Sequence, residues 1–259
     1  MKEKFNFKKK YGQNFLIDKN IVGKIISSVN PTSNDLIIEI GPGSGNLTRE
    51  LKKYNADLVA YEIDLDTKSL LDDLSDMKTT IIFDDFLKRD IKSDIRNISY
   101  DNLYVIANLP YYITTPIIEK IIKEGLNPKE MTLMVQKEVA DRLSAKPKTK
   151  EYGYITVFLN YYFDIEKLFN VPKGAFKPVP KVDSAVLKFK SHQRYKTDEA
   201  KFNELIKKAF MHKRKTLNNN LKGYDSEKLR EVLNKYELSP AARAEELPIE
   251  AFIDLVKYY

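Results

Sequence analysis

The sequence predicts an α/β protein in which a doubly wound parallel sheet is followed by a small all-helical domain. Two observations predict this fold class. Short apolar runs alternate with amphipathic segments through the first two thirds of the chain, which is the pattern of successive β-α units. Beyond about residue 192, only the helical spacing of apolar residues remains.

Five apolar runs have the length and composition of buried strands, namely Leu36–Ile40, Leu58–Ile63, Thr79–Phe83, Leu103–Ala107 and Met131–Gln136. Amphipathic segments lie between them at Leu47–Tyr54, Thr67–Leu74 and Thr115–Glu124. Two further strands are predicted at Ile155–Phe163 and Ser184–Phe189, with a proline-rich loop between them. We expect these two to extend the sheet as a hairpin-type addition.

The C-terminal part has three predicted helices. Apolar residues recur at helical spacing from Phe202 to Phe210 and again from Leu229 to Tyr236. A last helix follows Pro248, a residue favoured at helix starts. The change of pattern predicts two domains, residues 1–191 and residues 192–259.

The composition restricts the class of protein. The chain has 259 residues and no cysteine, so it cannot rely on disulfides, and we expect a cytoplasmic protein. No apolar run approaches the roughly 18 residues of a membrane span, and no membrane association is predicted. The net charge is +7, and residues 186–223 carry 11 Lys and Arg against 3 Asp and Glu. This local excess suggests contact with a polyanion. A solvated basic face would also explain the charge taken alone.

The tetrapeptide Asn108-Leu109-Pro110-Tyr111 is the most informative motif. It follows the predicted buried strand Leu103–Ala107, at the end where open α/β sheets bind ligands. The Asn108 carboxamide oxygen and the Leu109 carbonyl can accept two N–H bonds from an exocyclic amine, and Tyr111 can stack on a flat base. A turn closed by Pro110 would also explain the tetrapeptide alone. The glycine-rich motif upstream favours the functional interpretation.

That motif, Gly41-Pro42-Gly43-Ser44-Gly45, joins the first predicted strand to a helix. Glycines let the backbone approach a ligand closely. Glu62 ends the next strand, where an acid can hold ribose hydroxyls, and Asp85 or Asp84 can accept from an adenine amine. Because the turn contains no Lys or Arg to pair with a pyrophosphate, a nucleoside without phosphates, such as S-adenosylmethionine, fits better than NAD.

The sequence resembles the KsgA (RsmA) family of ribosomal RNA adenine dimethyltransferases, which is related to the Erm methylases. Seven ordered segments carry the resemblance: YGQNFLID at 11–18, EIGPGSGNLT at 39–48, NLPYYITTP at 108–116, QKEVADRL at 136–143, AFKPVPKVDSAVLKF at 175–189, KRKTL at 213–217 and ARAEEL at 242–247. The resemblance implies the Rossmann-like fold of S-adenosylmethionine-dependent methyltransferases.

The resemblance also implies roles for particular residues. The implied cofactor contacts are Asn14, Leu16, Gly41, Gly43, Glu62, Asp85 and Asn108. The implied catalytic residues are Asn108, Leu109, Pro110, Tyr111 and Phe176, with Phe176 stacking on the base opposite Tyr111. Its position alone would instead make Phe176 a core residue beside the prolines that follow it. The basic residues Lys213, Arg214 and Lys215 are expected to bind RNA phosphates. The family pattern is altered at FDDFL (83–87) and at Lys213, where arginine is frequent. No metal is expected.

The function implied is N6,N6-dimethylation of two adjacent adenosines in the 3'-terminal hairpin of 16S (small-subunit) rRNA, in ribosome biogenesis. Because no surplus apolar stripe calls for a partner subunit, we expect a monomer. Two alternatives stay open. One is an Erm-type methylase of 23S rRNA, and the other is an assembly factor that acts mainly by binding.

Overall fold

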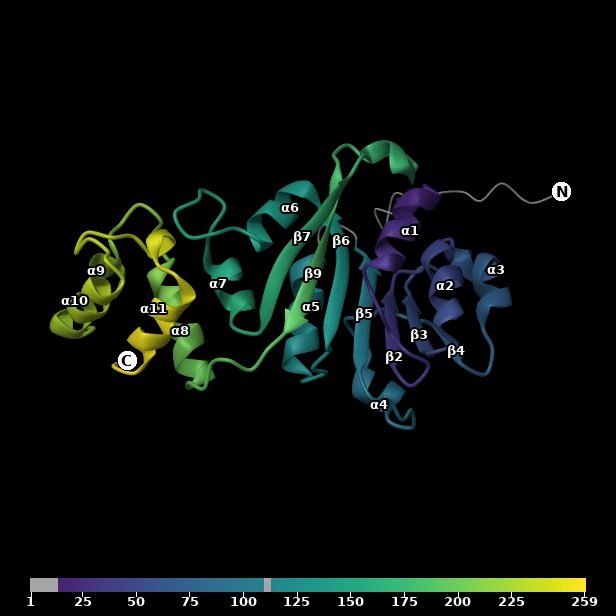
Figure 1. Ribbon diagram of the computed structural model, residues 1–259, viewed down its shortest axis with the longest axis horizontal. Helices are drawn as coiled ribbons and strands as arrows, with labels where there is room; N and C mark the ends of the chain where they lie inside the picture. Colours follow the sequence, from purple (N-terminus) through teal and green to yellow (C-terminus); the bar gives the residue numbers. More distant parts are fainter. Residues whose placement is uncertain (1–13, 110–112) are drawn as a thin grey trace. The chain divides into compact units, whose positions relative to one another are not determined.

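The computed structural model describes residues 14–109 and 113–259 of the chain. Within them, a seven-stranded sheet has the strand order β4-β3-β2-β5-β6-β9-β7 (Figure 1). Its strands are β2 (Leu36–Ile40), β3 (Asp57–Glu62), β4 (Thr79–Phe83), β5 (Leu103–Asn108), β6 (Glu130–Gln136), β7 (Phe163–Val171) and β9 (Ser184–Ser191). All pairs from β4 to β6 are parallel, and β9 is antiparallel to β6. The predicted doubly wound sheet is thus confirmed.

Helices cover both faces of this sheet. Along the chain, the first six α-helices of the described residues are α1 (Lys19–Ser27), α2 (Asn46–Leu51), α3 (Lys68–Leu71), α4 (Ile91–Ile95), α5 (Thr114–Lys123) and α6 (Lys137–Leu143). Leu58 of β3 lies in one core cluster with α1 and α2. Tyr61, three residues on, points to the other face, where its hydroxyl donates to Asp94 of α4 at 3.2 Å.

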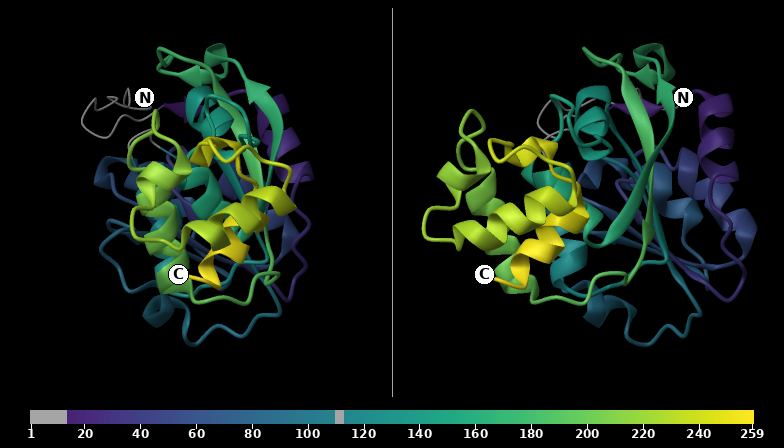
Figure 2. Two further views of the ribbon diagram at one scale, coloured as in Figure 1. Left: turned by 90° about the vertical axis from the view of Figure 1, so that its left-hand side faces the viewer. Right: turned by 60° about the vertical axis from the view of Figure 1, so that its left-hand side comes forward.

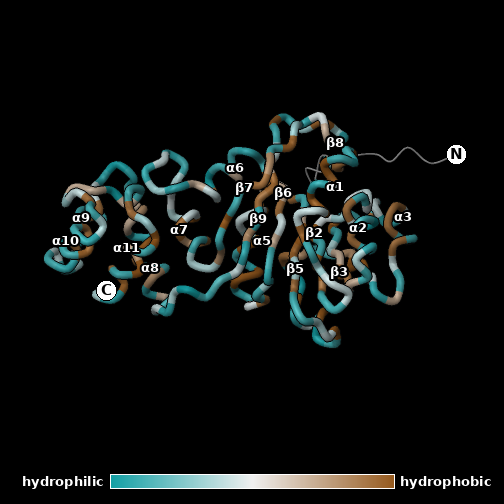
Figure 3. The backbone as a smooth tube through the Cα atoms, in the orientation of Figure 1, coloured by the Kyte–Doolittle hydropathy of each residue, from teal (hydrophilic) through white to brown (hydrophobic). Residues whose placement is uncertain are grey.

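Burial follows the pattern expected of a parallel sheet covered on both sides. Every residue of β2 is buried, as are the first five of β5. In Figure 3 the hydrophobic stretches run along the central strands, whereas much of the connecting chain is hydrophilic. This explains why near-continuous apolar runs marked these strands in the sequence.

The strand predicted at Ile155–Phe163 is wrong over most of its length. Tyr154–Asn160 forms helix α7, and the strand β7 begins only at Phe163. A short apolar run fits a buried helix as well as a strand. Here the Thr156 hydroxyl accepts from the Gly153 N–H at 3.3 Å and donates to the Arg142 carbonyl at 2.7 Å, which holds the first turn of the helix.

The chain divides into two compact units. The first contains the described residues up to Ala140 and Glu166–Ser191, and the second contains Asp141–Ile165 and His192–Tyr259. The segment Asp141–Ile165 therefore groups with the C-terminal helices, which the sequence-based boundary at residue 192 did not anticipate. The cause is packing: the ring of Tyr161, which follows α7, stacks on Phe202 with centroids 4.6 Å apart.

The second unit is helical. Its C-terminal helices are α8 (Glu199–Ala209), α9 (Leu217–Asn220), α10 (Ser226–Lys235) and α11 (Ile249–Val256), which gather into a bundle in both views of Figure 2. Asp225 caps α10 through the N–H groups of Glu227 and Lys228. Pro248 precedes α11, as the sequence predicted. Among the described residues, no helix has the length and hydropathy needed to cross a bilayer.

A small two-stranded sheet completes the first unit. β1 (Phe15–Leu16) pairs antiparallel with β8 (Phe176–Lys177), and Leu16 lies opposite Phe176. The Ile17 N–H also donates to the Ala175 carbonyl at 2.9 Å. This pairing fixes the start of the described chain beside the loop that joins β7 to β9.

Candidate active site

The candidate residues meet at one edge of the sheet because parallel strands end at the same edge. In the register, Ile40 of β2 lies opposite Tyr61 of β3 and Ala107 of β5. The chain runs outward from β2 to β3 and β4, then returns to β5 on the other side of β2. Such a reversal of strand order forms the crevice where open α/β sheets bind ligands.

The glycine turn after β2 requires its glycines. Gly41 and Gly43 have φ values of 73° and 56°, which side chains disfavour. A Cβ atom on Gly43 would lie 2.8 Å from the ring of Phe15, so the backbone and this ring are in direct contact. A Cβ on Gly41 would lie 3.6 Å from the Asn108 carbonyl oxygen. The turn therefore lies against both β1 and the end of β5.

Glu62, at the end of β3, holds this turn. One carboxyl oxygen accepts from the Gly43 N–H and the other from the Asp64 N–H, each at 2.9 Å. The residue is 3% exposed. Burial raises the pKa of Glu62, although the two backbone hydrogen bonds act in the opposite direction. Glu62 thus shapes the ligand-facing backbone as well as offering oxygens to a ligand.

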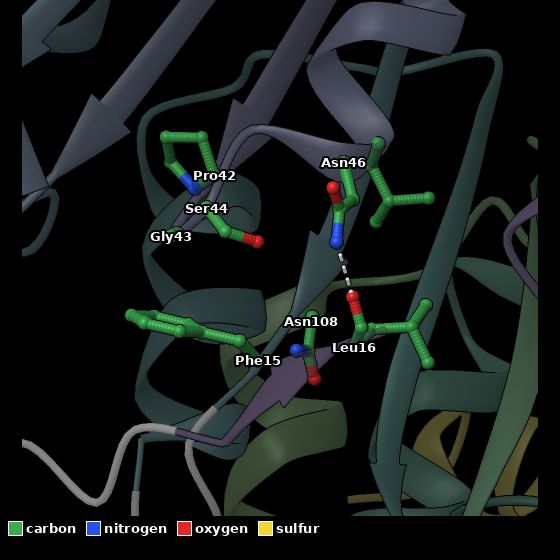
Figure 4. Close-up of a pocket in the computed structure, with 9 residues that line it drawn as sticks. Phe15, Leu16, Pro42, Gly43, Ser44, Asn46 and Asn108 are labelled. Atoms are coloured by element: carbon green, nitrogen blue, oxygen red, sulfur yellow. Dashed lines mark hydrogen bonds between the residues drawn. The ribbon is translucent and has the colours of Figure 1, made fainter. Parts of the chain in front are cut away.

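Asn108 is oriented by a hydrogen bond to the start of the described chain. Its Nδ2 donates to the Asn14 carbonyl at 3.2 Å. The amide nitrogen is thereby directed at β1, and the carboxamide oxygen is an acceptor whose orientation is fixed by that contact. Asn46 makes a similar link from the other side, donating to the Leu16 carbonyl at 2.6 Å (Figure 4).

A pocket joins these elements. It is lined by Phe15, Leu16, Gly41, Pro42, Gly43, Ser44, Asn46, Leu47 and Asn108. Its empty space, including the part open to solvent, is about 270 Å³. Of the predicted cofactor contacts, Leu16, Gly41, Gly43 and Asn108 line it, and Asn14 and Glu62 hydrogen bond to residues that do. Roles for Phe15, Ser44 and Asn46 were not predicted, although the motifs at 11–18 and 39–48 contain them.

Other predicted residues lie elsewhere. Asp85 follows β4, where one carboxyl oxygen accepts from the Leu87 N–H at 3.0 Å. Phe176 is 3% exposed and belongs to the core cluster rather than to the pocket lining. Pro110 and Tyr111 lie outside the described residues. Lys213, Arg214 and Lys215 form an exposed turn between α8 and α9 in the second unit.

The pocket suits a nucleoside without phosphates. No Lys or Arg is among its lining residues. Arg49 of α2 lies beneath the turn, but its guanidinium donates to the Ser44 and Leu70 carbonyls at 2.7 and 3.1 Å. Within the described ranges a pyrophosphate would therefore find no free cation here, whereas the backbone polar groups, the carboxylate of Glu62 and the amide of Asn108 match a nucleoside. The fold and this site define a Rossmann-like methyltransferase.

The comparisons with known proteins identify the family. The chain belongs to the ribosomal RNA adenine dimethylase family, whose model matches residues 4–259. It is 42% identical to the ribosomal RNA small subunit methyltransferase A of Lactococcus lactis subsp. lactis (strain IL1403), over 97% of this chain and 89% of that protein. The protein of the same name from Bacillus cereus (strain B4264) is 41% identical, over 97% and 90%.

Solved structures of two methyltransferases have the same fold as this chain. A dimethyladenosine transferase from Plasmodium falciparum superposes with a TM-score of 0.76 at 25% identity, covering 93% of this chain and 95% of that one. The 23S rRNA methyltransferase ErmE has the same fold, with a TM-score of 0.77 at 24% identity, covering 95% and 99%. The family, the fold class and the enzyme class predicted from the motifs are confirmed.

One buried acid near the pocket has an unusual protonation state. Glu39, in β2, is 1% exposed, and neither carboxyl oxygen has a hydrogen-bond partner in the described part of the chain. Burial raises the pKa of Glu39 to about 8; the nearby Thr48 hydroxyl acts in the opposite direction, and the charge of Glu62 adds a smaller rise. At neutral pH the folded protein therefore holds Glu39 in its protonated form.

This protonation predicts a pH dependence of stability. Between pH 4.5 and 8 the unfolded chain releases the Glu39 proton while the folded protein keeps it, so the free energy of unfolding falls as the pH rises. Glu39→Gln, which is neutral at every pH, should remove this fall. Urea unfolding at pH 5, 6, 7 and 8 measures it. The exposed Glu119 provides the control Glu119→Gln, and identical pH profiles for the wild type and Glu39→Gln would contradict the assignment.

Proposed function

We propose that this protein uses S-adenosylmethionine to dimethylate N6 of two adjacent adenosines in the 3'-terminal hairpin of 16S rRNA, during biogenesis of the small ribosomal subunit. We further propose that it acts as a cytoplasmic monomer. The small-subunit substrate is supported by the names of relatives that are 41 and 42% identical over nearly the whole chain. The reaction type is supported by the site itself.

The observation that carries the proposal is the orientation of Asn108. Because its amide nitrogen donates to Asn14, its oxygen is left to accept an N–H from the target amine. The Leu109 N–H donates to the Met134 carbonyl at 3.0 Å, which holds the peptide that follows Asn108 against β6. A second acceptor, the Leu109 carbonyl, is thus carried on a strand end rather than on a free loop.

The reaction needs orientation and charge stabilisation from these residues. The lone pair of an adenine amine is delocalised into the ring, and two acceptors that hold its N–H bonds favour a pyramidal, more nucleophilic nitrogen. When bound, S-adenosylmethionine supplies an electrophilic methyl group. Positive charge develops on the nitrogen, and the fixed dipoles of Asn108 and Leu109 stabilise it. We propose that Glu62 and the glycine turn position the cofactor, with Asp85 at the adenine end.

The target adenine must leave its stack to reach this site. We propose that Tyr111 stacks on the flipped base. A stacking role for Phe176 has less support, because its ring is buried in the core cluster and would have to be uncovered.

The test is a methyl-transfer assay on small subunits purified from cells that lack the gene, with product nucleosides resolved by mass. We expect N6,N6-dimethyladenosine at the two adjacent positions. Primer extension on both rRNAs identifies the substrate, because dimethyladenine stops reverse transcriptase. Stops that depend on the gene in the large-subunit rRNA, and none in the small-subunit hairpin, would instead support an Erm-type activity.

The basic turn, defined here as Lys213, Arg214 and Lys215, gives a separate prediction. All three side chains are exposed. Lys213→Ala/Lys215→Ala should weaken binding to small subunits and reduce the slope of log affinity against log salt by roughly 0.7–0.9 for each lost phosphate contact. Binding assays from 50 to 200 mM salt measure this. An unchanged slope would show that RNA does not contact this turn.

A further inference from the structure

We propose that a second basic segment of the helical unit, residues 144–151, binds RNA phosphates together with the basic turn. This segment, the basic loop, joins α6 to α7 (Figure 1). It carries Lys146, Lys148 and Lys150. The inference rests on the proposed function and extends its RNA-binding surface to a part of the chain that precedes residue 192.

Hydrogen bonds anchor the basic loop within the second unit. The Lys148 N–H donates to the Glu245 carbonyl at 2.8 Å. Tyr152, just after the loop, is 3% exposed, and its hydroxyl donates to the Leu247 carbonyl at 3.0 Å. Inside the loop, the Thr149 hydroxyl donates to the Lys146 carbonyl at 2.7 Å. The loop is thus held at both its middle and its end by residues 242–247.

A hydrogen bond also anchors the chain just after the basic turn to residues 242–247. The Leu217 N–H, two residues beyond the turn, donates to the Ala242 carbonyl at 2.8 Å. The anchor points Ala242 and Glu245 are three residues apart, so they lie within about 11 Å of each other even in a fully extended chain. Two basic segments that are some 65 residues apart in sequence therefore flank one short stretch of backbone.

The charges of this surface are available to a ligand. Lys146, Lys148 and Lys150 are exposed, and so are the three residues of the basic turn. Arg243, which lies between the anchor points Ala242 and Glu245, is exposed as well. None of these side chains pairs with an acid in the described ranges. Across the loop, the turn and residues 242–247 there are seven Lys and Arg against three Glu, and Glu246 already accepts from the Arg243 N–H at 2.7 Å. The surface thus keeps a net positive charge.

The chemistry of this surface favours RNA over a membrane. Met211, beside the basic turn, is exposed, but the loop carries no large apolar side chain, and an interfacial membrane site needs a wide apolar face. A folded RNA presents closely spaced phosphates, which match cations on two neighbouring segments.

The test compares full-length variants for binding and methylation of small subunits from cells lacking the gene. The loop variant is Lys146→Gln/Lys148→Asn/Lys150→Gln. Asn is used at 148 because φ there is 68°, which Asn tolerates. The control, Lys68→Gln/Lys92→Gln/Lys123→Gln, removes the same charge from exposed positions of the first unit. A milder variant, Lys146→Gln/Lys150→Gln, leaves the backbone at 148 unaltered.

We expect the salt slope of the loop variant to fall by about 2, from three contacts at roughly 0.7 each, and that of the milder variant by about 1.4. The KM for small subunits should rise severalfold, with kcat unchanged within about twofold. If the wild type is active and the loop variant has the same salt slope as the control variant, the inference about the basic loop is wrong and the proposed function still stands. A wild type that neither binds nor methylates small subunits overturns both proposals. Loop-dependent binding to anionic phospholipid vesicles, with an unchanged RNA slope, would assign the loop to a membrane instead.

Discussion

Asn108→Ala should lower kcat by about 100- to 1,000-fold, the range found when one preorganised polar group is removed from a transition-state site. The substitution removes an acceptor that the Asn14 hydrogen bond holds in place. Affinity for S-adenosylmethionine should change far less, because the glycine turn and Glu62 are untouched. Single-turnover methyl transfer and calorimetric titration of the cofactor measure the two effects separately.

Two further variants test the role of Asn108 more specifically. Asn108→Asp keeps the shape but replaces the donor to Asn14 with a second oxygen, so it should lose activity although it retains an acceptor. Asn234→Ala, at an exposed position of α10, is the matched control and should behave as wild type. An Asn108→Ala enzyme with normal kcat would refute the assigned role. An inactive Asn108→Ala protein that fully rescues ribosome assembly would favour the alternative in which binding is the essential act.

Gly43→Ala should both destabilise the protein and weaken cofactor binding. The new side chain would stand on a backbone with φ of 56°, and its Cβ would lie 2.8 Å from the Phe15 ring. The left-handed conformation alone costs about 1–2 kcal/mol. Since Phe15 also lines the pocket, its displacement should lower cofactor affinity at least tenfold. Urea unfolding and cofactor titration check the two expectations.

Gly23→Ala is the matched control for this substitution. Gly23 lies in α1, and a Cβ atom there would meet no other atom within 4 Å, so alanine should raise the free energy of unfolding by about 0.5–1 kcal/mol. In Phe15→Ala/Gly43→Ala the steric conflict is removed, and the two changes should be non-additive because the residues touch. Additive effects would show that the contact between Phe15 and Gly43 is unimportant.

The sheet could be predicted because its strands are buried on both faces. Runs such as Leu36–Ile40 leave little doubt about strand identity when Gly-rich turns and helices follow. The Ile155–Phe163 region has the same apolar character, but its conformation is decided by contacts to Arg142 and Phe202. Those partners are distant in sequence, and no local pattern reveals them.

The site was predictable in position but not in detail. Motif spacing placed Gly41, Glu62 and Asn108 at one edge of the sheet, because parallel strands end together. The hydrogen bond from Asn108 to Asn14 spans 94 residues, and the contact of Phe15 with Gly43 depends on where β1 lies. Phe176 lies in the core cluster, as its position in the sequence alone suggested, although the family resemblance implied a stacking role.

The pairing of β1 with β8 has a consequence for synthesis on the ribosome. Phe15 and Leu16 emerge early, but their partners Phe176 and Lys177 are translated some 160 residues later. The pairing cannot form before the second strand has been synthesised, and the N-terminal part of the chain emerges first. A nascent chain that stops before Phe176 contains the parallel strands β2 to β6, yet it lacks the partner that fixes Phe15 over the glycine turn. Competence to bind the methyl donor should therefore appear late in translation, after most of the sheet has formed.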